Sequence, residues 1–179
     1  MKTTRKLILT ALFVALGILL PISFHMVGLG KVFLPMHIPV ILGGMLVGPE
    51  VGLAVGAVTP MLSALLTGMP PLMPPVAQGM VFELAIYGGL AGLLYSRFRL
   101  NPFFVVTIVA LAGRLAYGTV AYLVLPLFGI SRVPILYPIT AGLVSGLPGV
   151  LLQVVLIPGL VYLVEKSHAL RYVRGENAR

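Results

Sequence analysis

Few residues of this chain could do chemistry, because its 179 residues include only 12 Lys and Arg and 4 Asp and Glu. Two of these charges, Glu83 and Arg114, lie inside long apolar stretches, where an ionisable side chain is costly and usually functional. The planar guanidinium of arginine binds both oxygens of a carboxylate or phosphate. Arg114 is therefore a candidate for binding an anionic ligand, or else it forms an internal ion pair with Glu83. Both hold if the ligand competes with Glu83 for the arginine.

Further polar side chains surround these two charges in the sequence. Gln78 lies one helical turn into the stretch that holds Glu83, and Tyr117 follows Arg114 on the same helical face. A lone histidine, His37, begins an apolar run and could equally be a satisfied structural group. The candidate substrate-binding residues are therefore His37, Gln78, Glu83, Arg114, Tyr117 and Tyr137, the last because it opens the final apolar stretch beside an outer loop.

The chain carries no sign of a cofactor or a catalytic centre. It has no cysteine, its three histidines lie far apart, and no carboxylate-rich metal cluster or hydrolase motif occurs. It also lacks a phosphate-binding P-loop, so any dependence on ATP must come from another subunit. We expect no cofactor, no bound metal and no enzymatic activity.

Composition places the chain in a membrane. Hydrophobic residues make up 59% and charged residues 9% of the sequence, against about 25% charged residues in a soluble domain. The formal charge of +8 comes from residues beside apolar stretches, with no basic face carrying interleaved aromatics, so we expect no nucleic-acid partner. The N-terminal basic patch and apolar run lack a small-residue cleavage site, which predicts a retained first span. We expect one integral membrane domain over residues 1–179.

The apolar stretches predict an all-α bundle of six transmembrane helices. The second helix, Ile38–Val47, is about 15 Å long at 1.5 Å per residue, half of a bilayer core of about 30 Å. The segment before it, His25 to Met36, must therefore enter the membrane as a re-entrant outer loop. Such backbone survives only where protein buries it or where it lines a wet cavity, which predicts a ligand cavity here. The other helices are Thr4–Phe24, Glu50–Leu66, Val76–Tyr95, Pro102–Leu125 and Pro138–Lys166.

Basic residues predict the orientation of the bundle, because Lys and Arg gather on the cytoplasmic side. With both termini cytoplasmic, the outer loops hold only Lys31 and Arg132. The cytoplasmic segments then hold Lys2, Arg5, Lys6, Arg97, Arg99, Lys166, Arg171, Arg174 and Arg179.

Small residues recur at four-residue spacing, which lets helix backbones approach closely in lipid. The glycine series favour packing within the bundle; they are Gly48, Gly52 and Gly56, Gly88 and Gly92, and Gly142 and Gly146. Ala11 and Ala15 lie on a peripheral first span. That pair could instead receive a helix of a partner protein.

The chain resembles the substrate-binding S components of energy-coupling factor (ECF) vitamin transporters. The resemblance rests on the Ala11-x-x-x-Ala15 pair and on Pro35-Met-His-Ile-Pro-Val40, Gly43-Gly-Met-Leu-Val-Gly-Pro49, Gly56-Ala-Val-Thr-Pro60, Leu66-Thr-Gly-Met-Pro-Pro71 and Glu83-Leu-Ala-Ile-Tyr-Gly88. In that family the first-helix motif docks on the energy-coupling membrane subunit. A third small residue is expected where this chain has Leu19, so the motif is partial. The chain looks closest to the branch that includes pantothenate and cobalamin S components.

The resemblance implies a high-affinity binding subunit of an ABC-type importer. It would bind a vitamin from outside, in a pocket formed by the outer halves of spans four to six and capped by the loops, and work with an energy-coupling transmembrane subunit and two cytoplasmic ATPases. The residues themselves predict an outer lid at Gly68–Pro75, because this segment holds no charge and has an apolar surface. Pantothenate is the first expectation because Arg114 suits its carboxylate, followed by cobalamin, folate or a queuosine precursor. A small intramembrane enzyme and a stand-alone channel or carrier are the alternatives.

Overall fold

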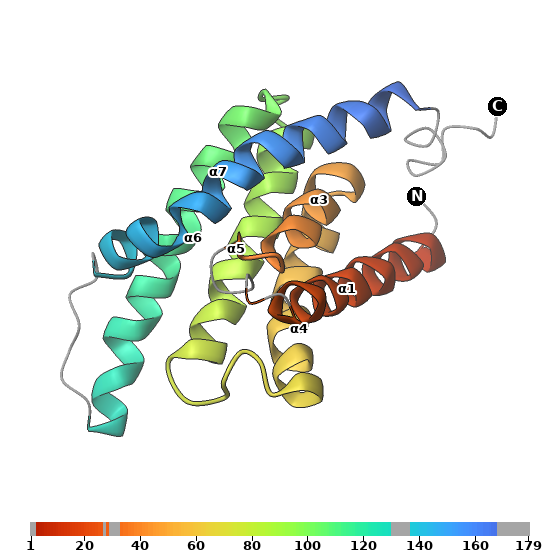
Figure 1. Cartoon of the computed structure of the whole chain (residues 1–179). Helices are drawn as coiled ribbons and strands as arrows, with labels where there is room; N and C mark the ends of the chain where they lie inside the picture. Colours follow the sequence, from red (N-terminus) through yellow and green to blue (C-terminus); the bar gives the residue numbers. More distant parts are fainter. Residues whose placement is uncertain (1–2, 27, 29–32, 130–136, 168–179) are drawn as a thin grey trace.

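The computed structural model describes residues 3–26, 28, 33–129 and 137–167, without the side chains of 137–146. These residues form a helical bundle in which the start of α1 and the end of α7 lie on the same side (Figure 1). The long helices are α1 (Thr3–Met26), α4 (Pro49–Thr67), α5 (Val76–Ser96), α6 (Pro102–Val124) and α7 (Tyr137–Lys166). The shorter α3 spans His37–Val47, and a 3₁₀ turn, η1 (Leu125–Phe128), follows α6.

The predicted fold class is confirmed over the described residues, which contain six α-helices and no strand. Five helical segments are long and apolar enough to cross a membrane, and α3 is a shorter apolar helix. The predicted helix bounds equal the observed ones or differ from them by one residue, except at the end of α1, which lies two residues later than predicted. Of the predicted re-entrant loop His25–Met36, residues 27 and 29–32 lie outside the described residues, and the last two, Pro35 and Met36, are buried. Its first two residues, His25 and Met26, instead belong to α1, so the first span is longer than predicted.

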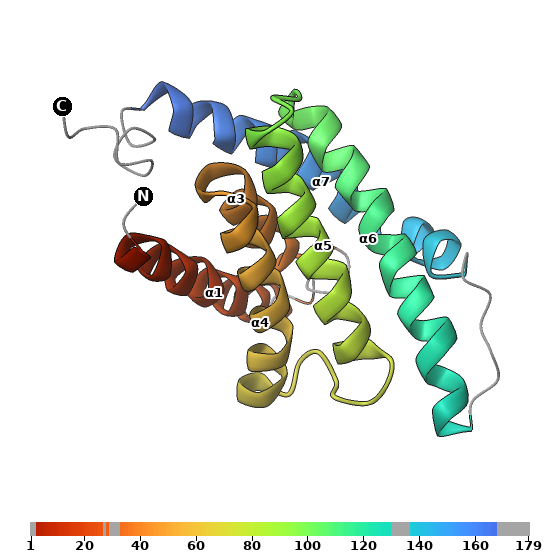
Figure 2. The same cartoon turned by 180° about the vertical axis from the view of Figure 1, so that it is seen from behind.

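Helices α3, α4 and α5 form the centre of the bundle, where glycines bring their backbones together (Figure 2). A Cβ added to Gly52 on α4 would lie 2.2 Å from the Gly88 carbonyl oxygen on α5. One added to Gly44 on α3 would lie 2.1 Å from that same oxygen. Of the predicted series, Gly52, Gly56, Gly88 and Gly92 therefore pack within the bundle. Close approach of this kind replaces the hydrophobic drive that lipid removes. An added Cβ at Gly48 would meet no atom within 4 Å, and the surroundings of Gly142 and Gly146 lie outside what the structure describes.

Gly52→Ala should destabilise the bundle because the new methyl group would meet backbone that no side-chain rotation can clear. We expect a loss of about 1–3 kcal/mol, the usual cost of overpacking a core, seen as a lower melting temperature in detergent. Gly159→Ala is the matched control, since its Cβ would have no atom within 4 Å. Equal melting temperatures for both variants would contradict the close packing.

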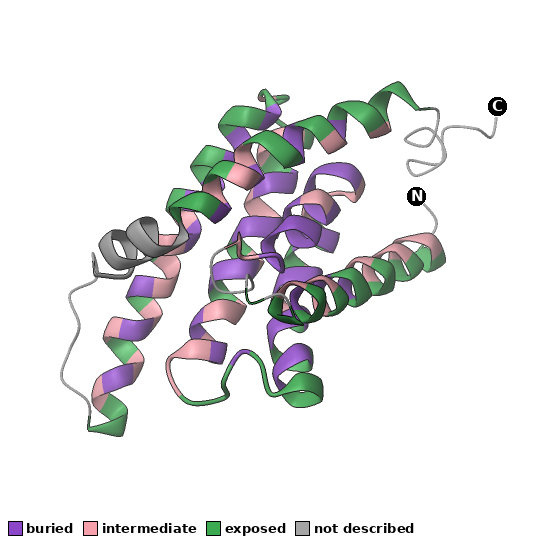
Figure 3. Ribbon diagram, in the orientation of Figure 1, coloured by how far each residue is buried: buried purple, intermediate pink, exposed green. Residues whose placement is uncertain are grey.

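The other helices surround this centre. α6 packs on α5, α7 packs on α6 and α3, and α1 packs on α3 and α4. Figure 3 shows burial concentrated in α3, α4 and α5, whereas α1 is exposed along most of its length. α1 buries only Val14, Gly17 and Pro21, and its Gly17 fits against the side chain of Thr59 on α4.

Candidate functional site

Glu83 and Arg114 form an ion pair between α5 and α6. The distance from Arg114 Nη1 to Glu83 Oε1 is 3.1 Å, and the side chains are 12% and 2% exposed respectively. Neither charge could remain so far from water without the other, because an unpaired charge in a low-dielectric interior is costly. The pairing predicted from the sequence is therefore present.

Two glycine–tyrosine contacts between α5 and α6 bring the two charges together, and each helix supplies one glycine and one tyrosine. On α5, Gly79 faces the ring of Tyr117; on α6, Gly113 faces the ring of Tyr87. Each tyrosine fills space that a side chain would otherwise occupy, so the helices approach at both positions. Glu83 lies midway between residues 79 and 87 on α5, which places its carboxylate at the level of Arg114.

His37, the first residue of α3, brings a third group to this pair. Its Nε2 lies 3.9 Å from Glu83 Oε1, and its side chain is 2% exposed. The imidazole also stands edge-on to the Tyr87 ring, with the ring centroids 4.8 Å apart. Glu83 Oε1 thus lies within 4 Å of both a guanidinium and an imidazole nitrogen.

Several polar atoms of this cluster lack hydrogen-bond partners among the described residues. They are both ring nitrogens of His37, Arg114 Nε, Glu83 Oε1 and, nearby, Gln78 Oε1. The carboxylate oxygen is within ion-pair distance of Arg114 but without hydrogen-bond alignment. A buried polar group left without a partner costs about 1–3 kcal/mol. The cluster therefore has spare capacity to donate to and accept from a polar ligand.

An apolar cavity of about 260 Å³ adjoins the cluster, and His37 belongs to both. The end of α1, the start of α3, the start of α5 and the α4–α5 connection enclose it. Its walls are Pro21, His25, Leu34, Pro35, Met36, Met69, Pro70, Pro71, Val76 and Met80. A cavity is therefore present at the start of α3, where the sequence predicts a ligand cavity.

The α4–α5 connection covers this cavity and is held at both ends. Ser63 Oγ donates to the Met69 carbonyl at 2.7 Å, and Gln78 Nε2 donates to the Leu72 carbonyl at 3.0 Å. Met73, farther along, is 76% exposed. The connection is therefore an apolar cover with few polar attachments, and one of them is the predicted ligand contact Gln78.

A family comparison bears on what this arrangement is for. Residues 5–161 match the model of the family described as ECF transporter, substrate-specific component. The chain belongs to this family. No curated protein and no solved structure gives a significant match.

Membership makes this substrate-specific component a transport subunit and not an enzyme. Components of this kind bind small-molecule substrates and work with an energy-coupling module. Family membership and the apolar helices together show that the chain is a multi-pass membrane protein.

The remaining predicted residues of this ECF component fall in different places. Tyr117 contacts α5 at Gly79, beside the charged cluster. Tyr137 begins α7, but its side chain lies outside the described residues. Ala11 and Ala15 are exposed on α1, where a partner could reach them.

Two buried side chains near the site escaped the sequence analysis as candidates. Gln153 on α7 is 1% exposed, and its Nε2 lies 3.5 Å from the Leu34 carbonyl. Tyr87 is 1% exposed and donates to the Ala110 carbonyl at 3.3 Å. A lone amide within the long apolar α7 was the signal available for Gln153, and the position of Tyr87 one turn after Glu83 was the signal for Tyr87.

Proposed function

We propose that this protein is the high-affinity binding subunit of an ECF importer for a water-soluble vitamin that carries a carboxylate, with pantothenate as the first choice. The observation that carries the proposal is Arg114, whose side chain is only 12% exposed. It is paired with Glu83 at 3.1 Å and retains an unpartnered Nε. A guanidinium of this kind can bind both oxygens of a carboxylate.

The size of the cavity favours a small cargo. Pockets for drug-sized ligands usually measure about 300–1,000 Å³, and the cavity beside His37 has about 260 Å³. Its apolar walls suit the aliphatic part of a molecule such as pantothenate, while the polar end reaches toward the cluster. A cobalamin would require a much larger opening, so it ranks second, before folate and a queuosine precursor.

The ion pair suggests how a carboxylate could enter without leaving a charge unpaired. An arriving carboxylate would share Arg114 with Glu83 or displace it. The displaced Glu83 has His37 Nε2 as its next neighbour, at 3.9 Å. Binding would thus exchange one partner of Arg114 for another, and His37 could take up the freed carboxylate.

The finer family assignment belongs to the same proposal. The motifs from Pro35 to Gly88 support the pantothenate and cobalamin branch, and the excess of basic residues beside the helix ends supports cytoplasmic termini. We propose that the cargo enters from the outside, beneath the α4–α5 connection. An energy-coupling transmembrane subunit, driven by two cytoplasmic ATPases, would then release it inside.

Native mass spectrometry of the freshly purified protein tests the cargo. We expect an adduct with the mass of pantothenate, because a high-affinity subunit retains its ligand through purification. Addition of pantothenate to ligand-stripped protein should restore the adduct and release heat in calorimetry. An adduct with the mass of cobalamin, folate or a queuosine precursor, and no binding of pantothenate, would overturn this choice.

Gln78→Leu should accelerate loss of the bound ligand, because the variant cannot donate the hydrogen bond that fastens the α4–α5 connection at Leu72. Loss of one such bond is worth about 1 kcal/mol, so we expect the dissociation rate to rise about fivefold in a stopped-flow chase. Thr107→Val is the control, since Thr107 is exposed on α6 and bonds only within its own helix. An unchanged rate in Gln78→Leu would mean that the connection does not limit release.

A further inference from the structure

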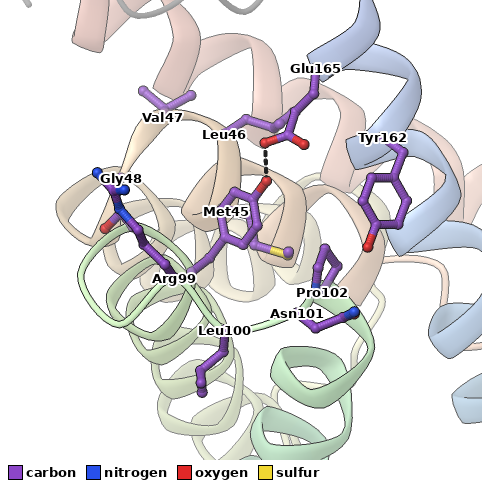
Figure 4. A pocket seen from close by; sticks show the side chains of 12 residues that line it. Met45, Leu46, Val47, Gly48, Arg99, Leu100, Asn101, Pro102, Tyr162 and Glu165 are labelled. Atoms are coloured by element: carbon purple, nitrogen blue, oxygen red, sulfur yellow. Dashed lines mark hydrogen bonds between the residues drawn. The ribbon is translucent and has the colours of Figure 1, made fainter.

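A second and larger cavity lies at the opposite end of the bundle, beside the end of α7. It measures about 560 Å³ and is enclosed by the end of α3, the α5–α6 connection and the last turns of α5 and α7. Polar side chains contribute much of its lining (Figure 4), among them Tyr95, Ser96, Arg99, Asn101, Tyr162 and Glu165. It shares no lining residue with the cavity beside His37, so the proposed vitamin site does not account for it.

Opposite charges face this cavity from two different elements. Figure 4 shows Glu165 and Tyr162 projecting from α7, and Arg99 coming from the α5–α6 connection. The Tyr95 hydroxyl donates to Glu165 Oε1, which holds the carboxylate at the cavity wall. Arg99 forms no ion pair with any residue that the structure describes, Glu165 included. A ligand with both charges could bridge them.

The backbone holds Arg99 in a conformation that ordinarily selects glycine. Its φ is +52°, in the left-handed region that side chains disfavour. The chain needs this turn to close α5, because the Leu100 N–H donates to the Leu94 carbonyl at 3.2 Å. A glycine would make the same turn without strain. The presence of arginine therefore points to a use for its guanidinium at this wall.

The cavity lies beside the ends of helices that are long and apolar enough to cross a membrane, where we expect the border between lipid and water. Tyr95 and Tyr162 are in the last turns of membrane-spanning helices, the depth at which tyrosines border lipid headgroups. We propose that the cavity binds a phosphoethanolamine group, in the form of a phospholipid headgroup. Arg99 pairs with the phosphate, and Glu165 accepts hydrogen bonds from the primary ammonium.

Lipid titration by native mass spectrometry tests this site. Delipidated protein receives dioleoyl phosphatidylethanolamine, phosphatidylcholine or phosphatidylglycerol. We expect the ethanolamine lipid to bind about fivefold more tightly than the choline lipid, because a trimethylated ammonium cannot donate to Glu165. Glu165→Gln should remove this preference and leave binding of the glycerol lipid unchanged.

Arg99→Gln should weaken binding of both phosphatidylethanolamine and phosphatidylglycerol about tenfold, because both rely on the phosphate contact. Arg97→Gln, an exposed arginine two residues away that does not line the cavity, is the matched control and should bind like the wild type. Melting temperatures of the delipidated variants check their folding. If Arg99→Gln does not fold, the proposal is tested by Glu165→Gln alone, through its loss of preference for the ethanolamine lipid over the choline lipid.

Equal binding of the ethanolamine and choline lipids by the wild type would overturn the proposal, and so would equal losses in Arg97→Gln and Arg99→Gln. Soluble phosphoethanolamine provides a further arm. If it binds the delipidated protein and the ethanolamine lipid does not compete with it, the site takes a soluble metabolite and the lipid assignment is wrong. Weak competition by the soluble compound against a tightly bound lipid supports the headgroup.

Discussion

Arg114→Ala should reduce ligand affinity by at least about a hundredfold, because it removes the buried cation that we propose binds the carboxylate. Breaking a buried pair costs roughly 3–5 kcal/mol, and each 1.4 kcal/mol is about a factor of ten in affinity. Arg114→Lys keeps the charge but loses the planar fork, so its loss should be substantial and smaller. Isothermal titration calorimetry of the purified variants with pantothenate measures both effects.

Arg114→Ala also leaves Glu83 buried without its cation, so the single variant could lose affinity through misfolding alone. Further variants and ligands therefore separate a structural role of Arg114 from a role in binding. The double variant Arg114→Ala/Glu83→Gln removes both charges. It should recover stability relative to the single variant while still failing to bind. An amide analogue of the ligand should bind the native protein weakly and lose less affinity on Arg114→Ala. Equal losses for acid and amide, or recovery of binding in the double variant, would show that Arg114 serves the fold alone.

Ala11→Leu and Ala15→Leu should each abolish vitamin uptake while leaving ligand binding by the isolated protein intact. Both residues are exposed on α1, and the helix uses another face, through Val14, Gly17 and Pro21, to pack on the bundle. The added bulk would keep the backbone of a partner helix at a distance, so coupling to the energy-providing subunit should fail. Uptake in whole cells and calorimetry on purified protein separate the two steps.

Gly159→Leu is the matched control for this docking face, because it adds bulk at another exposed position with no atom within 4 Å of its Cβ. It should transport at the wild-type rate. Normal uptake by both alanine variants at equal expression would place the docking surface elsewhere. Loss of ligand binding in either variant would instead point to a folding defect.

The sequence by itself determined the helices and their nature. Membrane spans are legible because lipid demands long apolar segments whose backbone groups are all hydrogen-bonded, and Gly48-Pro49 marked the end of the short α3. The pairing of Glu83 with Arg114 was also predictable, because two opposite charges inside apolar spans must find each other. The motifs from Pro35 to Gly88 identified the family, which the comparison over residues 5–161 supports.

Only the tertiary structure decided which side chains share a cavity. His37 lies 46 residues before Glu83 in the chain, yet its ring nitrogen is 3.9 Å from that carboxylate, because glycines let α3 and α4 approach α5 more closely than side chains would allow. Gln78, a predicted ligand contact, also fastens the α4–α5 connection through its Nε2. From the sequence, Arg99 counted only among the basic residues that set the orientation, and Glu165 was not singled out. Their common cavity depends on the packing of α7 across α3 and α6, which spacing along the chain does not encode.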